Sequence, residues 1–149
     1  MMNKQSAVIH MNDEMLYARI AYIIPFQKGP DAGREPILLI RAKQHEEISF
    51  DISLFFIGLK PSHVYLASYS IRPAKEDELY PQFFFQKKFR VDDIEAIGGF
   101  LPVSFDAPIT LPHGIPTGQY RIDAKLNVEG GNEDETKTSV SFIDVRIEG

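Results

Sequence analysis

The amino-acid sequence predicts an all-β fold, an antiparallel β-sandwich of about seven to nine strands. Residues 46–58 and 119–128 alternate apolar with polar side chains, which is typical of a strand with one buried face. Turns that contain glycine and proline separate several further short segments rich in aromatic and β-branched residues. A β-barrel or a jelly roll is the alternative architecture for the same pattern.

Length and composition favour one self-sufficient domain. The chain has 149 residues, of which 44% are apolar and 25% charged, and these values are ordinary for a globular protein. We expect a loose N-terminal leader over residues 1–13 and a single sandwich domain over residues 14–149. The chain contains no cysteine, so disulfides, thiolate metal sites and cysteine nucleophiles are excluded.

The first strand is expected over residues 15–26. Pro25 lies near its end and removes a ladder donor, which favours an edge position or a strand end. Residues 27–36 contain two glycines and two prolines and predict a loop. A short second strand should cover residues 37–42.

The next strand is one of the clearest. In residues 46–58 the apolar positions of the alternation are Ile48, Phe50, Ile52, Leu54 and Phe56. A turn is expected over residues 58–62, and residues 63–71 should return as the hairpin partner of 46–58. A polar connection then covers residues 72–81.

Residues 82–91 place aromatic residues on both faces of one strand. One face carries Phe83, Phe85, Phe89 and Val91, and the other carries Phe84, Gln86, Lys88 and Arg90. Lys87 falls on the first, apolar face, which indicates a bulge or a strand end where its stem reaches solvent.

One helical turn at most is expected, near residues 92–97, capped by Asp92 or Asp93 and ended by Gly98. Residues 100–111 contain two prolines and fit an edge strand or an extended crossing.

The last two strands should form a hairpin. The inward set of residues 119–128 is Tyr120, Ile122, Ala124, Leu126 and Val128. An acidic turn follows over residues 129–135, where the run Gly130-Gly131-Asn132 supplies residues that tolerate positive φ. In the closing strand, 138–148, the apolar pattern shifts by one residue between Phe142 and Ile143, which indicates a bulge.

The segment Ile115–Ile122 resembles the Pro-x-Gly-x-Tyr start of a late strand in bacterial immunoglobulin-like β-sandwich domains. The resemblance covers this segment and the closing hairpin, and it implies an immunoglobulin-like sandwich. It implies structural roles for Pro116, Gly118 and Tyr120: the glycine makes a tight turn, and the tyrosine packs at the end of the sandwich with its hydroxyl bonded to backbone. Adhesins, inhibitors, carbohydrate-binding modules and spacers share this fold, so no activity comes with it.

The candidate binding surface is Phe84 with Lys88 and Arg90. An outward aromatic beside two cations predicts an exposed patch that fits a partner. The same composition suits single-stranded nucleic acid, but a net charge of −5 disfavours that partner. We therefore expect a non-enzymatic binding module for a protein partner or for self-association. Tyr65 and Tyr69 allow an aromatic ladder for sugars, or ordinary cross-strand packing.

No catalytic residue, metal site or cofactor is predicted. The four histidines show none of the spacings that metal sites use. The acidic turn at 129–135 is interpreted as a solvated hairpin tip, with a weak calcium site as its alternative. An enzyme whose site is assembled from loops would use His63, His113 and a nearby carboxylate.

A structural subunit is the other alternative, with the edge segments 15–26 and 100–111 buried between copies. The chain lacks an apolar run of membrane-spanning length, and residues 1–13 lack the apolar core of a signal peptide. We expect no membrane association and a cytoplasmic location.

Overall fold

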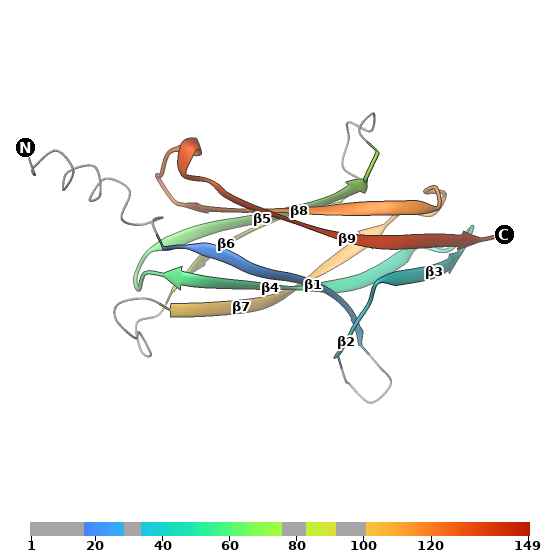
Figure 1. Cartoon of the computed structure of the whole chain (residues 1–149), viewed down its shortest axis with the longest axis horizontal. Coiled ribbons are helices and arrows are strands. Elements are labelled where there is room, and N and C mark those ends of the chain that lie inside the picture. Colours follow the sequence, from blue (N-terminus) through green and yellow to red (C-terminus); the bar gives the residue numbers. More distant parts are fainter. Residues whose placement is uncertain (1–16, 29–33, 76–82, 92–100) are drawn as a thin grey trace, which may run out of the picture.

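Two β-sheets pack face to face in the structure, a computed structural model that describes residues 17–28, 34–75, 83–91 and 101–149 (Figure 1). One sheet has four strands in the order β2-β1-β4-β7, and the other has five in the order β3-β9-β8-β5-β6. The described strands are β1 (Arg19–Lys28), β2 (Arg34–Pro36), β3 (Leu39–Lys43), β4 (Ile48–Leu59), β5 (Val64–Pro73), β6 (Phe83–Arg90), β7 (Leu101–Leu111), β8 (Gly118–Val128) and β9 (Lys137–Glu148). The predicted all-β sandwich is confirmed.

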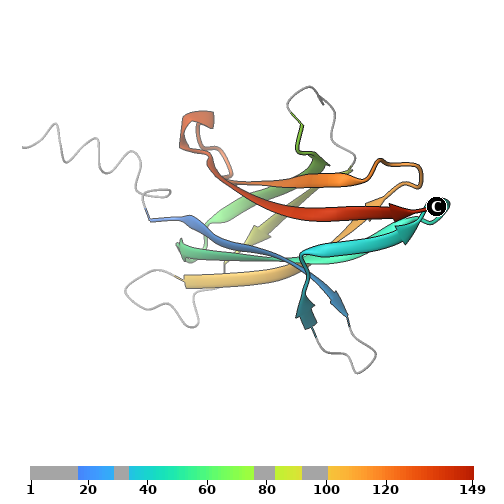
Figure 2. The same ribbon diagram turned by 45° about the vertical axis from the view of Figure 1, so that its right-hand side comes forward.

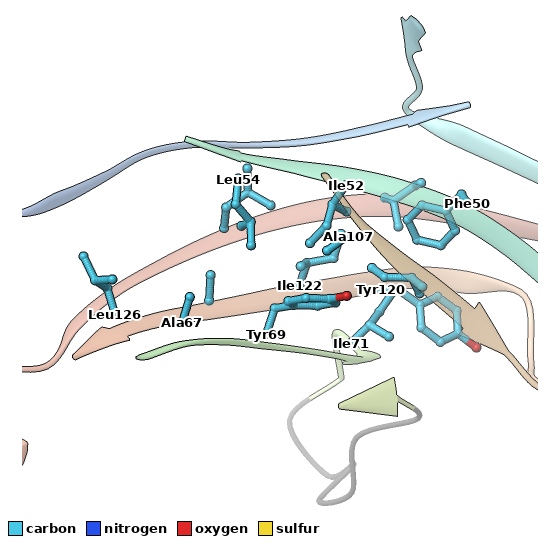
Figure 3. Packing of buried hydrophobic residues seen from close by; sticks show 14 of the residues in the cluster. Phe50, Ile52, Leu54, Ala67, Tyr69, Ile71, Ala107, Tyr120, Ile122 and Leu126 are labelled. Atoms are coloured by element: carbon cyan, nitrogen blue, oxygen red, sulfur yellow. The ribbon is translucent and has the colours of Figure 1, made fainter. Parts of the chain in front are cut away.

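The core lies between the two sheets because each strand turns alternate side chains inward. Ile52 of β4 and Ala107 of β7 face Tyr69 of β5 and Ile122 of β8 (Figure 3). These four side chains are at most 2% exposed. Removing a large apolar side chain from water contributes about 1.5–3 kcal/mol, so this interior holds the sheets together without cross-links.

The predicted hairpin between residues 46–58 and 63–71 is wrong, because β4 and β5 belong to different sheets. The β4–β7 ladder shifts register between Phe56 and Leu59. Within this irregularity Gly58 has a φ of 73°, and Ser62 in the following turn has a φ of 66°. These two left-handed residues carry the chain across the sandwich instead of back along the same sheet.

Neither predicted bulge is present. The β8–β9 register is continuous from Gly118↔Val145 to Leu126↔Lys137, so Val140 and Phe142 are outward residues of a regular strand. The β5–β6 register is also continuous. Lys87 stays on the inward side of edge strand β6, where its ammonium lies 4.4 Å from the centre of the Phe105 ring and gains a cation–π attraction.

One strand pair departs from the predicted antiparallel arrangement. β3 pairs in parallel with β9, from Leu39↔Asp144 to Lys43↔Glu148, and Figure 2 shows the two strands side by side. The chain makes this contact because β1 lies in the four-stranded sheet and the chain crosses to the five-stranded sheet before β3.

Three smaller expectations have mixed outcomes. The predicted loop 27–36 contains the short strand β2, which pairs with the end of β1. Strand β7 lies at the edge of its sheet, as expected. The helical turn expected near residues 92–97 lies outside the described residues, whose helical content is one 3-10 turn at Glu133–Glu135.

Gly58→Ala should lower the free energy of unfolding more than the same change at the other described positive-φ glycines, Gly114, Gly118 and Gly130. A Cβ there would lie 1.9 Å from the Tyr17 carbonyl oxygen, so the chain before β1 must move. Gly130→Ala is the matched control, since its φ of 81° is similar and nothing lies within 4 Å of its added Cβ. We expect a loss of about 1 kcal/mol at Gly130 from backbone strain alone and roughly 3 kcal/mol or more at Gly58. Urea denaturation measures both, and equal losses would contradict the proposed close approach.

Candidate functional site

The outer face of the five-stranded sheet carries exposed apolar side chains on two separated strands. Phe84 of β6 is 60% exposed, and on β9 Val140 and Phe142 are 40% and 52% exposed. The pairing registers align Phe84 with Ser70, Ser70 with Asp123, and Asp123 with Val140. One cross-strand row therefore joins the two apolar positions.

A hollow of about 370 Å³ lies on this face, and Ser70, Asp123 and Val140 of the row line it. Space is left there because the Ser70 side chain is small, whereas Arg72 and Arg121 in the neighbouring row have long side chains. Its lining residues are Ser70, Arg72, Arg121, Asp123, Ala124, Lys125, Thr138 and Val140.

Two arginines share one aspartate in the hollow. The Arg121 Nε donates to Asp123 Oδ1 at 2.8 Å, and the Arg72 Nε lies 3.5 Å from Asp123 Oδ2. The Asp123 side chain is 20% exposed, whereas those of Arg72 and Arg121 are 36% and 38% exposed. Within the described residues, the terminal nitrogens of both guanidinium groups make no hydrogen bond.

The two arginines also lie directly opposite each other in the β5–β8 ladder. Like charges in directly opposed positions destabilise a sheet, so Asp123 offsets a local repulsion that the fold does not require. The cluster keeps a net positive charge, to which Lys125 on the rim adds.

The outward strand positions of this sheet are mostly basic where they are charged, although the chain as a whole is acidic. The outward positions of its strands hold eight basic residues, Arg41, Lys43, Arg72, Lys88, Arg90, Arg121, Lys125 and Arg146, against the three acidic residues Asp123, Asp144 and Glu148. The net charge of the full chain is −5. Positive charge is thus concentrated on one face of the molecule.

The predicted patch residues all point outward from β6 but do not form one cluster. Phe84 does not line the hollow but lies opposite Ser70, which does. Lys88 lies farther along the strand and pairs with Glu129 at 3.1 Å, and Arg90 is exposed beyond it. The sequence-based prediction therefore included Phe84 but missed the arginines, the aspartate and the outward pair on β9. Only the register between strands brings these residues together.

The two histidines considered for a catalytic site assembled from loops lie far apart in the structure. His63 precedes β5, close to the end of β4, whereas His113 follows Leu111, which pairs with Ile48 at the start of β4. Twelve residues of strand put about 40 Å between the two ends, so the histidines share no site. Among the described residues there is also no cluster of three potential metal ligands.

The tyrosines that allowed an aromatic ladder belong to the core. Tyr65 and Tyr69 are at most 2% exposed. The Tyr69 hydroxyl donates to the Pro108 carbonyl oxygen at 2.6 Å. Burial, and then the charge of Asp51, raises the pKa of Tyr69 well above its ordinary value, so the hydroxyl remains a donor.

The segment that resembles immunoglobulin-like domains forms the start of β8. Tyr120 is 1% exposed, and its hydroxyl donates to the Pro116 carbonyl oxygen at 2.7 Å. Gly118 has a φ of 153° at the first position of the strand. The tyrosine therefore makes the backbone hydrogen bond that the resemblance implies.

No protein-family model matches the chain, and no curated protein matches its sequence. Among solved structures, the chain resembles the sporulation control protein Spo0M of Bacillus subtilis, with 14% identity and a TM-score of 0.45 over 89% of this chain and 50% of that one. It also resembles a CARDB domain from Pyrococcus furiosus, described as a complex with di-metal ions, with 11% identity and a TM-score of 0.34 over 87% and 97% of the two chains. The chain spans half the length of the Spo0M structure. Both likenesses concern the fold alone.

No helix among the described residues is long and apolar enough to cross a lipid bilayer.

Phe84→Ser should leave the free energy of unfolding within about 0.5 kcal/mol of the wild-type value, because an exposed side chain contributes little to folding. Phe85→Ser on the same strand is the control. Its ring stacks on Tyr69 with centroids 5.3 Å apart, and its loss should cost about 2 kcal/mol or more. Equal destabilisation in chemical denaturation would show that Phe84 is a packing residue and not a surface residue.

Proposed function

We propose that this chain is a non-enzymatic binding module that engages a protein partner through the outer face of its five-stranded sheet. The observation that carries the proposal is the pair of apolar positions, Phe84 on β6 and Val140 with Phe142 on β9, on either side of a charged hollow. The inner face of the same sheet already forms the core, so the fold gives no reason for outward phenylalanines. A partner that covers them does.

The composition of this face is that of a protein interface. Phenylalanine and arginine are enriched at such interfaces, and a few aromatic and arginine anchors supply most of the binding energy. Covering the exposed part of two phenylalanines removes apolar surface from water, which contributes about 25 cal/mol per Å². The charged rows beside them supply orientation more than affinity.

The proposal is tested by selecting peptides from a random display library on the immobilised full chain. Wild type should enrich peptides that the double variant Phe84→Ser/Phe142→Ser binds at least about tenfold more weakly, since each anchor is worth more than about 1 kcal/mol.

The matched control for this selection is Tyr22→Ser, which removes an aromatic that is 64% exposed on the four-stranded sheet. It should bind the selected peptides as wild type does. Loss of binding with Tyr22→Ser but not with the double variant would place the interface on the other sheet.

Self-association is the second candidate, and one observation favours it. Tyr22 packs edge-to-face on Phe55 with centroids 6.1 Å apart, and Ile57 beside them is 48% exposed, so the four-stranded sheet also has an outward apolar patch. The prolines of edge strand β7 oppose pairing through that edge, because Pro102 and Pro108 lack the donor that a new strand would need. Light scattering across concentration separates the candidates: a dimer that Tyr22→Ser abolishes supports assembly, and a monomer at every concentration excludes it.

A further inference from the structure

We propose that the hollow on the five-stranded sheet receives an acidic side chain of an extended partner segment, held between Arg72 and Arg121. Apolar side chains on either side of that acid would lie on Phe84 and on Val140. This inference rests on the proposed function and names the chemistry of the partner.

The charge of the face selects an acidic partner. Eight basic residues against three acidic ones line the outward positions of the sheet, while the chain as a whole has a net charge of −5. Complementary potentials steer association and suppress partners of the wrong sign. An isologous contact with a second copy would press this basic face against itself, so a second copy is the less suitable occupant.

Arg72 and Arg121 are arranged so that together they could bind a carboxylate group. Both guanidinium groups direct their Nε atoms at Asp123, which is the least exposed of the three side chains. Each arginine presents five N–H donors in a planar fork, so the terminal groups remain available above the aspartate. A carboxylate from outside would accept from them, and charge-assisted bonds of this kind are about twice as strong as neutral ones.

The spacing of the face fits an extended chain. Neighbouring strands are about 4.8 Å apart, so Phe84 and Val140, three strands apart in the row, are about 14 Å apart. Residues i and i+4 of an extended segment are about 13 Å apart and point to the same side. Arg72 and Arg121 stand in the neighbouring row, but their Nε atoms reach Asp123 of this row. A segment that crosses the strands would therefore place an apolar side chain over Phe84, an acidic one beside the two guanidinium groups and an apolar one over Val140.

Nucleic acid fits the same face less well. Two cations outside the hollow already have carboxylate partners there: Arg41 contacts Glu148, and Lys88 contacts Glu129. These carboxylates would face phosphates along the path. Val140 offers no ring on which a base can stack.

The test uses three fluorescein-labelled peptides with the cores Leu-Ser-Glu-Ser-Leu, Leu-Ser-Gln-Ser-Leu and Leu-Ser-Lys-Ser-Leu, together with an oligothymidylate. Fluorescence anisotropy with the full chain should show the glutamate peptide binding at least about tenfold more tightly than the glutamine peptide, since hydrogen bonds to a charged group are worth about 1.5–3 kcal/mol. The lysine peptide should bind most weakly.

Variants assign the preference to the hollow. Arg72→Ala and Arg121→Ala should each remove most of the tenfold preference for glutamate over glutamine, and Arg121→Glu should reverse it toward the lysine peptide. Lys43→Ala is the control, because it removes an exposed cation from β3 on the same face but outside the hollow, and it should keep the preference.

Two outcomes would overturn the inference: equal or undetectable binding of the glutamate and glutamine peptides at millimolar concentration, or tighter binding of the oligothymidylate that needs both arginines. The display selection keeps these failures distinct from failure of the proposed function. If the selected peptides require Phe84 and Phe142 but carry no acidic residue, the result supports the proposed binding face and contradicts the proposed carboxylate site.

Discussion

The sandwich depends on how three buried tyrosines satisfy their hydroxyl groups. Tyr65, Tyr69 and Tyr120 are at most 2% exposed, and a buried hydroxyl without a hydrogen bond costs about 1–3 kcal/mol. Each one has a backbone partner: the Lys60 amide donates to Tyr65, while Tyr69 and Tyr120 donate to the carbonyl oxygens of Pro108 and Pro116. The Tyr69 bond runs from β5 of one sheet to β7 of the other, so it adds a polar link between the sheets in a chain without cysteine.

The buried side chains determine which residues point outward on the five-stranded sheet. Since Tyr69 and Ile71 must point inward, their neighbours Ser70 and Arg72 must point outward. Tyr120 and Ile122 fix Arg121 and Asp123 in the same way on the adjacent strand. The hollow is therefore built on rigid strands and not on loops, and its arginines have a defined separation. On a surface formed by strands, little conformational entropy is lost when a ligand binds.

The alternation of apolar and polar residues predicts which face of most strands is buried. Which strands share a sheet, and which residues lie opposite each other, depends on the pairing between strands. Strict period two predicted the buried faces of 46–58 and 119–128 and the outward position of Phe84. It did not reveal that β4 and β5 lie in different sheets, because a strand with one buried face fits either sheet. It also misassigned Val140 and Phe142, which look like core residues only if outward positions must be polar. The cluster of Arg72, Arg121 and Asp123 follows from the β5–β8 register, which neither strand encodes alone.

The parallel pairing of β3 with β9 has a consequence for how the domain folds. Arg41 and Glu148, which join the two strands by a 2.9 Å hydrogen bond, are 107 residues apart in the sequence. Closing so long a loop is slow compared with forming the β8–β9 hairpin. During synthesis, β3 therefore cannot pair with β9 until β9 has emerged from the ribosome. An unpaired strand edge during that interval favours aggregation and binding by chaperones.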